Sequence, residues 1–209
     1  MSRTWPPRDD SDYTAEVTAR LGAELCRRLA GVRAIVLDCD GVLTDGRMYY
    51  DGDGEAFKAF HAHDGLGLVL ARAGGLKLAL LTGRQSPAAV RRCTELRFHV
   101  IKSGRFDKQQ ALLEIAEELD VSCDDMLYLG DDLIDVPALD LAGVPACVPE
   151  ACDDVRDRCD LVTETAGGGG AAREVAELVL KAGGRFGDAL RKVGEKAWLP
   201  TTAGGGDDA

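Results

Sequence analysis

Two aspartates, Asp38 and Asp40, stand two residues apart directly after the apolar run 34–37, and a glycine-containing segment ends at Gly46. In an extended chain alternate side chains point the same way, so both carboxylates can address one site. The carboxyl ends of strands in an open α/β sheet are also where ligands bind. Because a hydrophobic strand gains nothing by ending in two acids, we expect a cation to compensate their charge.

Three further segments carry groups that suit the same chemistry. Thr82-Gly83-Arg84 follows an apolar run, Lys108 opens a helical pattern, and Gly130-Asp131-Asp132 with Asp135 follows another apolar run. Each segment alone is ordinary as a turn, a connector, a surface lysine or a helix N-cap. Together they offer carboxylates for a hard ion such as Mg²⁺. They also offer a hydroxyl, glycine N–H groups and a lysine for a phosphoryl group. The joint pattern predicts a magnesium-dependent phosphoryl-transfer site.

The elements that must position these segments alternate in type. Buried strands are predicted at 33–38, 76–81, 126–129 and 144–148, with shorter ones at 98–101 and 160–162. Helical spacing of apolar residues predicts helices at 11–30, 64–73, 87–96, 107–119 and 171–182. A glycine turn at 51–54 predicts a β-hairpin within 48–60. The alternation predicts an α/β fold: a Rossmann-like, mostly parallel sheet with helices on both faces and a small hairpin insertion.

The chain of 209 residues is expected to form a single domain over 11–182. We expect residues 1–10 to be a flexible lead and residues 183–209 a helical or flexible tail. The formal net charge of -11 argues against nucleic acid or an anionic membrane as a partner. It does not exclude an anionic small substrate, because a local cluster of basic residues can override the overall sign.

The cysteines and the amino-terminal segment bear on location. Seven cysteines without a CxxC pair indicate free thiols in a reducing compartment rather than a disulfide framework. The group Cys147, Cys152 and Cys159 lacks the spacing of a zinc site. No signal-like apolar core is found at the start, and no apolar run reaches 18 residues. We therefore expect a cytoplasmic protein.

Two apparent metal motifs fail on their own spacing. Asp51, Asp53 and Glu55 resemble the start of a calcium loop, but alanines stand at its sixth and twelfth positions. His61 and His63 alternate and can share a face, yet no third soft ligand accompanies them. Polar wall residues at a subunit interface are the preferred interpretation of these two histidines.

The four segments in this order resemble the haloacid dehalogenase superfamily of phosphohydrolases over residues 33–182. The resemblance implies that Asp38 takes the phosphoryl group as an aspartyl phosphate and that Asp40 is the general acid and base. It implies Mg²⁺ held by Asp38, the backbone carbonyl of Asp40, and Asp131. Thr82 and Gly83 would bind phosphoryl oxygens, and Lys108 would balance charge. The catalytic set is then Asp38, Asp40, Thr82 and Lys108, with Asp132 and Asp135 supporting the metal or its waters.

A closer resemblance is to the 3-deoxy-D-manno-octulosonate 8-phosphate phosphatase family. It rests on Asp40–Gly46, 57–60, 64–67, 82–84, 130–135 and the glycine run before Arg173-Glu174. That family lacks a cap domain, as this chain does, and forms a tetramer in which one subunit's hairpin lines the next subunit's site. It implies a homotetramer with shared sites and a role in lipopolysaccharide biosynthesis. The implied substrate contacts are Asp40, His61, His63, Asp64, Gly65, Gly83, Arg84, Arg92, Lys108 and Asp132.

Three departures leave the sugar open. The family usually has arginine at His63, another near Val69, and Arg or another large residue at Gly169. Arg72 either compensates or is a plain helix-surface residue. Arginine after Thr-Gly, here Arg84, is typical of the octulosonate type, whereas glutamate is typical of relatives acting on nine-carbon acid phosphates. The alternatives are therefore a phosphatase for a nine-carbon or other sugar phosphate, and a non-catalytic tetramerisation module.

Overall fold

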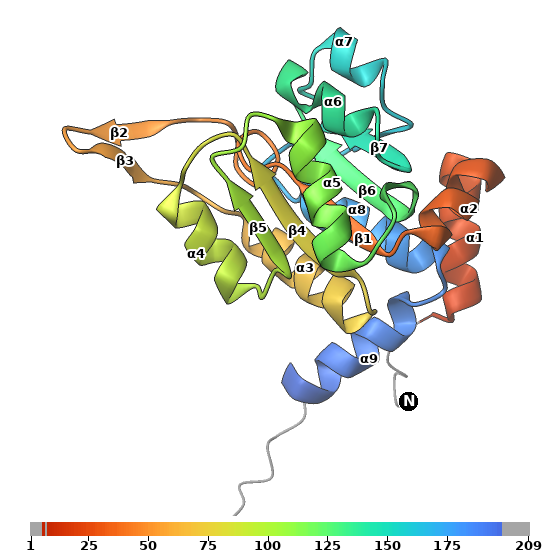
Figure 1. The fold of residues 1–209 in the computed structure, drawn as a ribbon. Coiled ribbons are helices and arrows are strands. Elements are labelled where there is room, and N and C mark those ends of the chain that lie inside the picture. Colours follow the sequence, from red (N-terminus) through yellow and green to blue (C-terminus); the bar gives the residue numbers. More distant parts are fainter. Residues whose placement is uncertain (1–5, 7, 198–209) are drawn as a thin grey trace, which may run out of the picture.

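A six-stranded, all-parallel sheet forms the centre of the protein, as the computed structural model of residues 6 and 8–197 shows (Figure 1). Its order is β5-β4-β1-β6-β7-β8. The strands are β1 (Ala34–Leu37), β4 (Lys77–Thr82), β5 (Val100–Ser103), β6 (Met126–Gly130), β7 (Val144–Cys147) and β8 (Leu161–Val162). Every residue of β1 and β6 is buried, because helices cover both faces of the sheet. The predicted α/β fold class is confirmed.

The register of the sheet places the carboxyl ends of β1, β4 and β6 side by side. Leu37, the last residue of β1, pairs with Leu80 of β4 and Leu129 of β6. The Asp38 N–H then donates to the Leu129 carbonyl at 3.0 Å, so the backbone leaves β1 in a fixed direction. The loops that follow β1, β4 and β6 therefore meet at one edge of the sheet.

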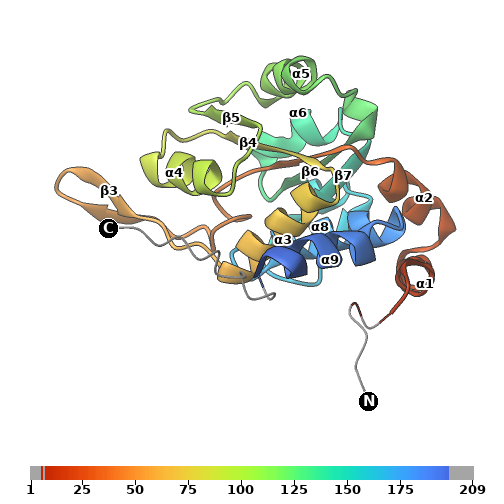
Figure 2. The same cartoon turned by 90° about the horizontal axis from the view of Figure 1, so that it is seen from below.

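Alternate side chains of β1 enter two separate cores. Ile35 and Leu37 face a large core shared with α1 (Asp10–Leu21), α2 (Ala23–Gly31), α3 (Ala62–Ala73), α4 (Pro87–Glu95), α8 (Ala171–Ala182) and α9 (Phe186–Ala197). Ala34 and Val36 face a smaller core with α5 (Lys108–Leu119), η1 (Cys123–Asp125), α6 (Val136–Leu139) and α7 (Asp153–Arg156). Figure 2 shows α5 and α6 on one side of the sheet and α3, α8 and α9 on the other.

The amino-terminal region differs from its prediction. A single helix over 11–30 was expected, but Gly22 at φ +81° separates α1 from α2. Glycine adopts this left-handed conformation without a steric penalty, so the chain can turn there. Helix α1 already begins at Asp10, within the predicted lead, and residues 1–5 and 7 of that lead lie outside the described residues.

The predicted tail contains a packed helix. In α9, Phe186 is buried and meets the Tyr13 ring edge-on with the two centroids 4.9 Å apart. The Gly187 N–H donates to Asp10 Oδ1 at 2.7 Å. Phe186, Leu190 and Val193 face the core at helical spacing, which explains why this segment packs. Residues 198–209 of the predicted tail lie outside the described residues.

The predicted hairpin is confirmed as an antiparallel pair, β2 (Tyr49–Asp51) and β3 (Gly54–Phe57). It projects away from the sheet beside α4 (Figure 1). Between Gly46 and Leu76 the chain forms only this hairpin and α3, so no lid covers the sheet edge from this insertion. Among the helices of the described residues, none combines the length and apolar character that crossing a membrane requires.

Candidate active site

The four predicted segments converge on one pocket at the carboxyl edge of the sheet. It has a volume of about 290 Å³. Its lining comprises Asp38, Asp40, Gly46, Met48, Thr82, Gly83, Arg84, Phe106, Lys108, Asp131, Asp132 and Ile134. All of the predicted catalytic and metal-binding residues are in this set. Parallel pairing of β4, β1 and β6 brings together residues as far apart in sequence as Asp38 and Ile134.

Lys108 is the cation buried beneath this pocket. It is the first residue of α5, and its Nζ donates to Asp38 Oδ1 at 2.8 Å and to Asp135 Oδ1. Burial acts to lower the pKa of Lys108, but the charges of Asp38 and Asp135 outweigh it and the pKa is raised. The side chain therefore carries a fixed positive charge against the first aspartate of the site.

Asp135 organises the site without facing the pocket. Its Oδ1 accepts from Lys108 and from the Tyr128 hydroxyl at 2.6 Å. Its Oδ2 accepts from the backbone N–H groups of Asp131 at 3.0 Å and Asp132 at 3.2 Å. The sequence interpretation gave Asp135 only a supporting role and missed Tyr128, because a tyrosine inside an apolar strand carries no signal that distinguishes it from the core. These bonds fix the turn that presents Asp131.

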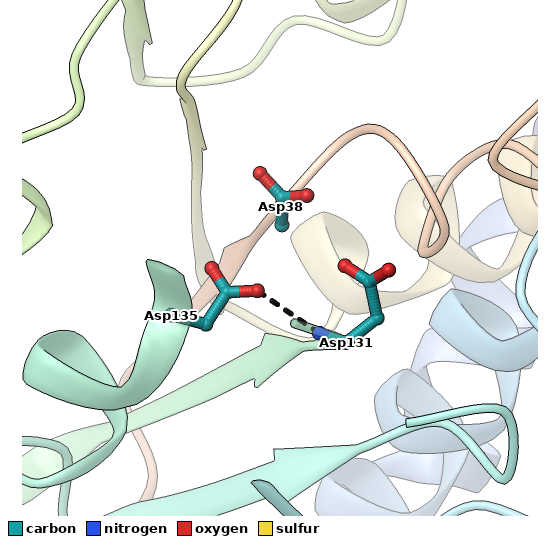
Figure 3. Close-up of side chains that lie close together, drawn as sticks. All are labelled: Asp38, Asp131 and Asp135. Atoms are coloured by element: carbon teal, nitrogen blue, oxygen red, sulfur yellow. Dashed lines mark hydrogen bonds between the residues drawn. The ribbon is translucent and has the colours of Figure 1, made fainter. Parts of the chain in front are cut away.

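The acidic cluster fits a divalent cation. One oxygen from each of Asp38, Asp131 and Asp135 lies within 4.8 Å of the others (Figure 3). Burial raises the pKa of Asp38 to about 7, and burial followed by the charge of Asp38 raises that of Asp131 to about 8. Burial and the mutual repulsion of the acids thus outweigh the opposing charge of Lys108. Both oxygens of Asp135 accept hydrogen bonds, whereas Asp38 accepts from Lys108 through Oδ1, so Asp131 and the second oxygen of Asp38 are the better candidates to bind a hard ion such as Mg²⁺.

Two glycines allow the acids to approach the backbone. A Cβ on Gly41, whose φ is +91°, would lie 2.0 Å from Asp131 Oδ2. A Cβ on Gly130 would lie 2.6 Å from Asp135 Cγ. Both contacts are far inside van der Waals distance, so any larger residue would displace the carboxylates. The glycines of the first and fourth segments thus have a steric role at the site.

Asp40 lies at the other side of the pocket, among groups from the hairpin. Its Oδ1 accepts from Lys58 Nζ, and Arg84 Nε lies 3.8 Å from its Oδ2. Burial acts to lower the pKa of Lys58, yet the bond to Asp40 gives a net rise. Lys58 belongs to a segment that supported the family resemblance, but sequence reasoning assigned it no role. Only its position behind Asp40 singles it out.

Five predicted substrate-binding residues lie outside this pocket. His61 is the N-cap of α3, where its Nδ1 accepts from the His63 N–H at 3.2 Å. Asp64 is buried and accepts from the Arg173 N–H at the start of α8, at 2.9 Å. A Cβ on Gly65 would lie 2.4 Å from an Arg92 guanidinium nitrogen, so these two residues are in contact. The structure does not bring this group of residues to the pocket that holds Asp38.

The positions that depart from the family pattern also lie away from Asp38. His63 and Gly169 line a separate cavity of about 320 Å³ beside α8. Val69 and Arg72 line another, of about 580 Å³, with residues of α9. Arg72 sits near the end of α3, just before the chain enters β4 at the opposite edge of the sheet. It is therefore not positioned to compensate for a missing arginine in the pocket that holds Asp38.

Comparisons with known proteins agree with this geometry. A family model described as haloacid dehalogenase-like hydrolase matches residues 94–175. The 3-deoxy-D-manno-octulosonate 8-phosphate phosphatase of Haemophilus influenzae is 36% identical over 159 residues, covering 76% of this chain and 88% of that protein. The Escherichia coli K12 phosphatase of the same name is 36% identical over 169 residues, covering 81% and 90%.

A solved structure extends the likeness to three dimensions. The Moraxella catarrhalis 3-deoxy-D-manno-octulosonate 8-phosphate phosphatase, crystallised with a magnesium ion, a phosphate ion and the sugar acid, superposes with a TM-score of 0.77. It is 38% identical, and the match covers 81% of this chain and 97% of that one. Sequence and fold thus point to the same group of proteins over nearly their whole length.

Proposed function

The chain belongs to the 3-deoxy-D-manno-octulosonate 8-phosphate phosphatase family of haloacid dehalogenase-like hydrolases, and we propose that it hydrolyses that sugar-acid phosphate with Mg²⁺ as cofactor. The observation that carries the proposal is the buried Asp38, held by Lys108 at 2.8 Å and clustered with Asp131 at the floor of the pocket. A carboxylate held in this way is a nucleophile placed for attack on phosphorus.

Asp38 acts first in the proposed reaction. One of its oxygens forms a bond to phosphorus as the bond from phosphorus to the sugar oxygen breaks, which leaves an aspartyl phosphate on Asp38. Lys108 offsets the repulsion between carboxylate and phosphate, because its charge is fixed 2.8 Å from Asp38 Oδ1. Bound Mg²⁺, held by Asp38, Asp131 and the backbone carbonyl of Asp40, would supply further positive charge.

Asp40 moves the protons. Its carboxyl group gives a proton to the leaving sugar oxygen in the first half of the reaction. In the second half the resulting carboxylate takes a proton from water as the water attacks the aspartyl phosphate, so Asp40 is restored. Thr82 and the Gly83 N–H line the pocket at the end of β4, where they can bind the phosphoryl oxygens.

Arg84 supports an acidic sugar as the substrate. Its guanidinium lies at the pocket mouth, half exposed, and donates to the Tyr50 hydroxyl of the hairpin at 3.0 Å. A guanidinium pairs well with a sugar-acid carboxylate because it offers paired donors. We therefore propose the octulosonate ester as the preferred substrate, with a nine-carbon acid phosphate as the competing outcome of the test below.

The proposal includes a homotetramer with shared active sites. Tyr50 and Phe57 on the hairpin are 61% and 56% exposed, and such exposed aromatic side chains suit a contact with a protein neighbour. Such a neighbour would also explain why the predicted contacts His61, His63, Asp64, Gly65 and Arg92 do not line their own subunit's pocket. A cytoplasmic location and a role in lipopolysaccharide biosynthesis complete the proposal, with neither nucleic acid nor membrane as a partner.

Phosphate release from a panel of sugar phosphates tests this function. With Mg²⁺ present we expect the highest kcat/KM on the octulosonate ester, and with EDTA we expect little phosphate release. Asp38→Asn should lower kcat/KM by at least about 10³-fold. The matched control is Asp157→Asn. Asp157 is an exposed aspartate directly after α7, so this variant should retain full activity. Release that survives Asp38→Asn would refute the mechanism, and no turnover of any ester by the wild type would favour a tetramerisation module.

A further inference from the structure

Lys58, the residue after the hairpin, contacts Asp40 at the carboxyl edge of the sheet. Its side chain is only 2% exposed, although it follows directly after the exposed strand β3. The ammonium group lies between two carboxylates, donating to Asp40 Oδ1 and standing 3.2 Å from Glu55 Oε2. A lysine is almost never this buried unless its charge is paired, so its place is set by these two acids.

The contacts continue beyond Glu55 into the body of the protein. Glu55 Oε1 accepts from the Ser86 hydroxyl at 2.6 Å. Ser86 is itself buried and is the N-cap of α4, with its Oγ accepting from the Ala89 N–H at 3.2 Å. A connected row therefore runs from Asp40 through Lys58 and Glu55 to the start of α4. Hydrogen bonds join Asp40 to Lys58 and Glu55 to Ser86, and an ion pair joins Lys58 to Glu55, so the Lys58 ammonium group is held from two sides.

We propose that Lys58 is a positioning residue for proton transfer, one that fixes the orientation of the Asp40 carboxyl group through Oδ1. The inference rests on the proposed function, in which Asp40 is the general acid. Because Oδ1 already accepts from an ammonium group, the proton that Asp40 delivers is carried on Oδ2. Oδ2 lies 3.8 Å from Arg84 Nε, and both residues line the pocket in which the substrate would bind.

This role makes a distinctive prediction about leaving groups. An alkyl ester such as the sugar phosphate needs a proton on its leaving oxygen, whereas p-nitrophenolate is stable enough to leave without one. Loss of Lys58 should therefore slow cleavage of the alkyl ester but not of the aryl ester. A lysine that only stabilises the fold would affect both esters alike. The measured quantity is kcat/KM, which reports the first half of the reaction.

The experiment compares Lys58→Met and Lys58→Arg with the wild type on the octulosonate ester and on p-nitrophenyl phosphate. We expect Lys58→Met to lose about 10- to 100-fold in kcat/KM on the sugar ester, a part of the 10²–10⁴-fold that general acid catalysis contributes. On the aryl ester we expect kcat/KM to fall by less than about threefold. Lys58→Arg should recover part of the loss because it keeps a charged donor.

Two further variants separate position from general stability. Lys102→Met removes a lysine that also bridges two carboxylates, Glu114 at 3.1 Å and Glu118 at 2.6 Å, but lies on β5 away from the pocket. This variant should leave kcat/KM unchanged on both esters. In an Asp40→Asn background, adding Lys58→Met should cause no additional loss, since its effect acts through Asp40.

Several results would overturn the inference while leaving the proposed function intact. One such result is that Lys58→Met lowers kcat/KM equally on both esters, or on neither. Another is that Lys58→Met causes its full loss of kcat/KM even in the Asp40→Asn background. If Lys58→Met does not fold, as its melting curve would show, Glu55→Gln replaces it. That variant keeps Lys58 but weakens its anchor, so a smaller selective loss on the sugar ester is expected, and its absence would count against the role. Failure of the proposed function itself would appear separately, as turnover that survives Asp38→Asn.

Discussion

The two halves of the active site are built differently. One half stands on the sheet edge, where Lys108, Asp38, Asp135 and Tyr128 are buried and joined by hydrogen bonds. The other half is supplied by the hairpin, whose strands are short and largely exposed and whose links to the body pass through a few polar side chains. The difference indicates that the attacking group is placed by the core, whereas proton transfer and substrate choice depend on a more weakly anchored segment.

The largest expected effect contrasts one acid from each half. Asp135→Ala leaves the buried Lys108 with a single partner and orphans the Tyr128 hydroxyl, so we expect a loss of about 3–5 kcal/mol in the free energy of unfolding. Glu55→Ala removes one partner each from the buried Lys58 and Ser86, but the Glu55 carboxylate is 21% exposed and water can replace it, so we expect a smaller loss of about 1–2 kcal/mol. Urea denaturation midpoints at constant slope measure both values. Similar losses for the two variants would contradict the comparison.

The hairpin is expected to matter for assembly more than for folding. A Tyr50→Ala, Phe57→Ala double variant should dissociate the proposed tetramer, as seen by light scattering. It should also lower kcat/KM on the sugar ester by about 10-fold or more, because a site shared between subunits would then be incomplete. Its melting temperature should change little apart from the effect of dissociation. The matched control is Leu113→Ala, which removes an exposed apolar side chain from α5 and should leave the tetramer intact. A fully active monomer would contradict the proposal of shared sites.

The acids of the sheet half should make stability depend on pH when no metal is present. The folded-state pKa of Asp131 is raised from 3.8 to about 8, so the folded protein retains a proton that the unfolded chain loses above about pH 4. Stability in EDTA should therefore fall as the pH rises toward 8. A loss of about 1 kcal/mol would lower the melting temperature by about 2–4 °C.

Two additions test the origin of that pH dependence. Mg²⁺ should raise the melting temperature more at pH 8 than at pH 6, because the ion competes with protons for the same carboxylates. Asp131→Asn should flatten the dependence, since an amide does not titrate in this range. Stability in EDTA that rises between pH 6 and pH 8 would contradict the assignment of Asp131 as an uncompensated buried acid.

The smallest expected effect concerns substrate choice. Arg84→Lys keeps the charge but loses the paired donors of a guanidinium, so KM for the octulosonate ester should rise by about 3- to 10-fold. The constants for p-nitrophenyl phosphate, which has no sugar carboxylate, should hardly change. An equal effect on both esters would show that Arg84 serves the phosphoryl group or Asp40 rather than the sugar acid.

Much of the sheet half could be predicted from the sequence. Unbroken apolar runs identify strands buried on both faces, and the acids and Thr82 that follow those runs must lie at the carboxyl edge of a parallel sheet. The break at Gly22 and the packing of α9 were missed, because both depend on what the helices contact. The local spacing of apolar residues does not predict whether a helix is interrupted at a glycine or whether Phe186 packs against Tyr13.

The amino-acid sequence by itself determined the α/β fold and the chemical inventory of the site, since strand periodicity and the order of the four segments are local properties of the chain. Only the tertiary structure decided how those groups divide their tasks. It showed that Asp135 accepts hydrogen bonds on both carboxylate oxygens, whereas Asp38 accepts one from Lys108 on Oδ1 and clusters with Asp131. It also placed Lys58 behind Asp40. Such assignments depend on distances between residues far apart in the chain, and folding alone sets those distances.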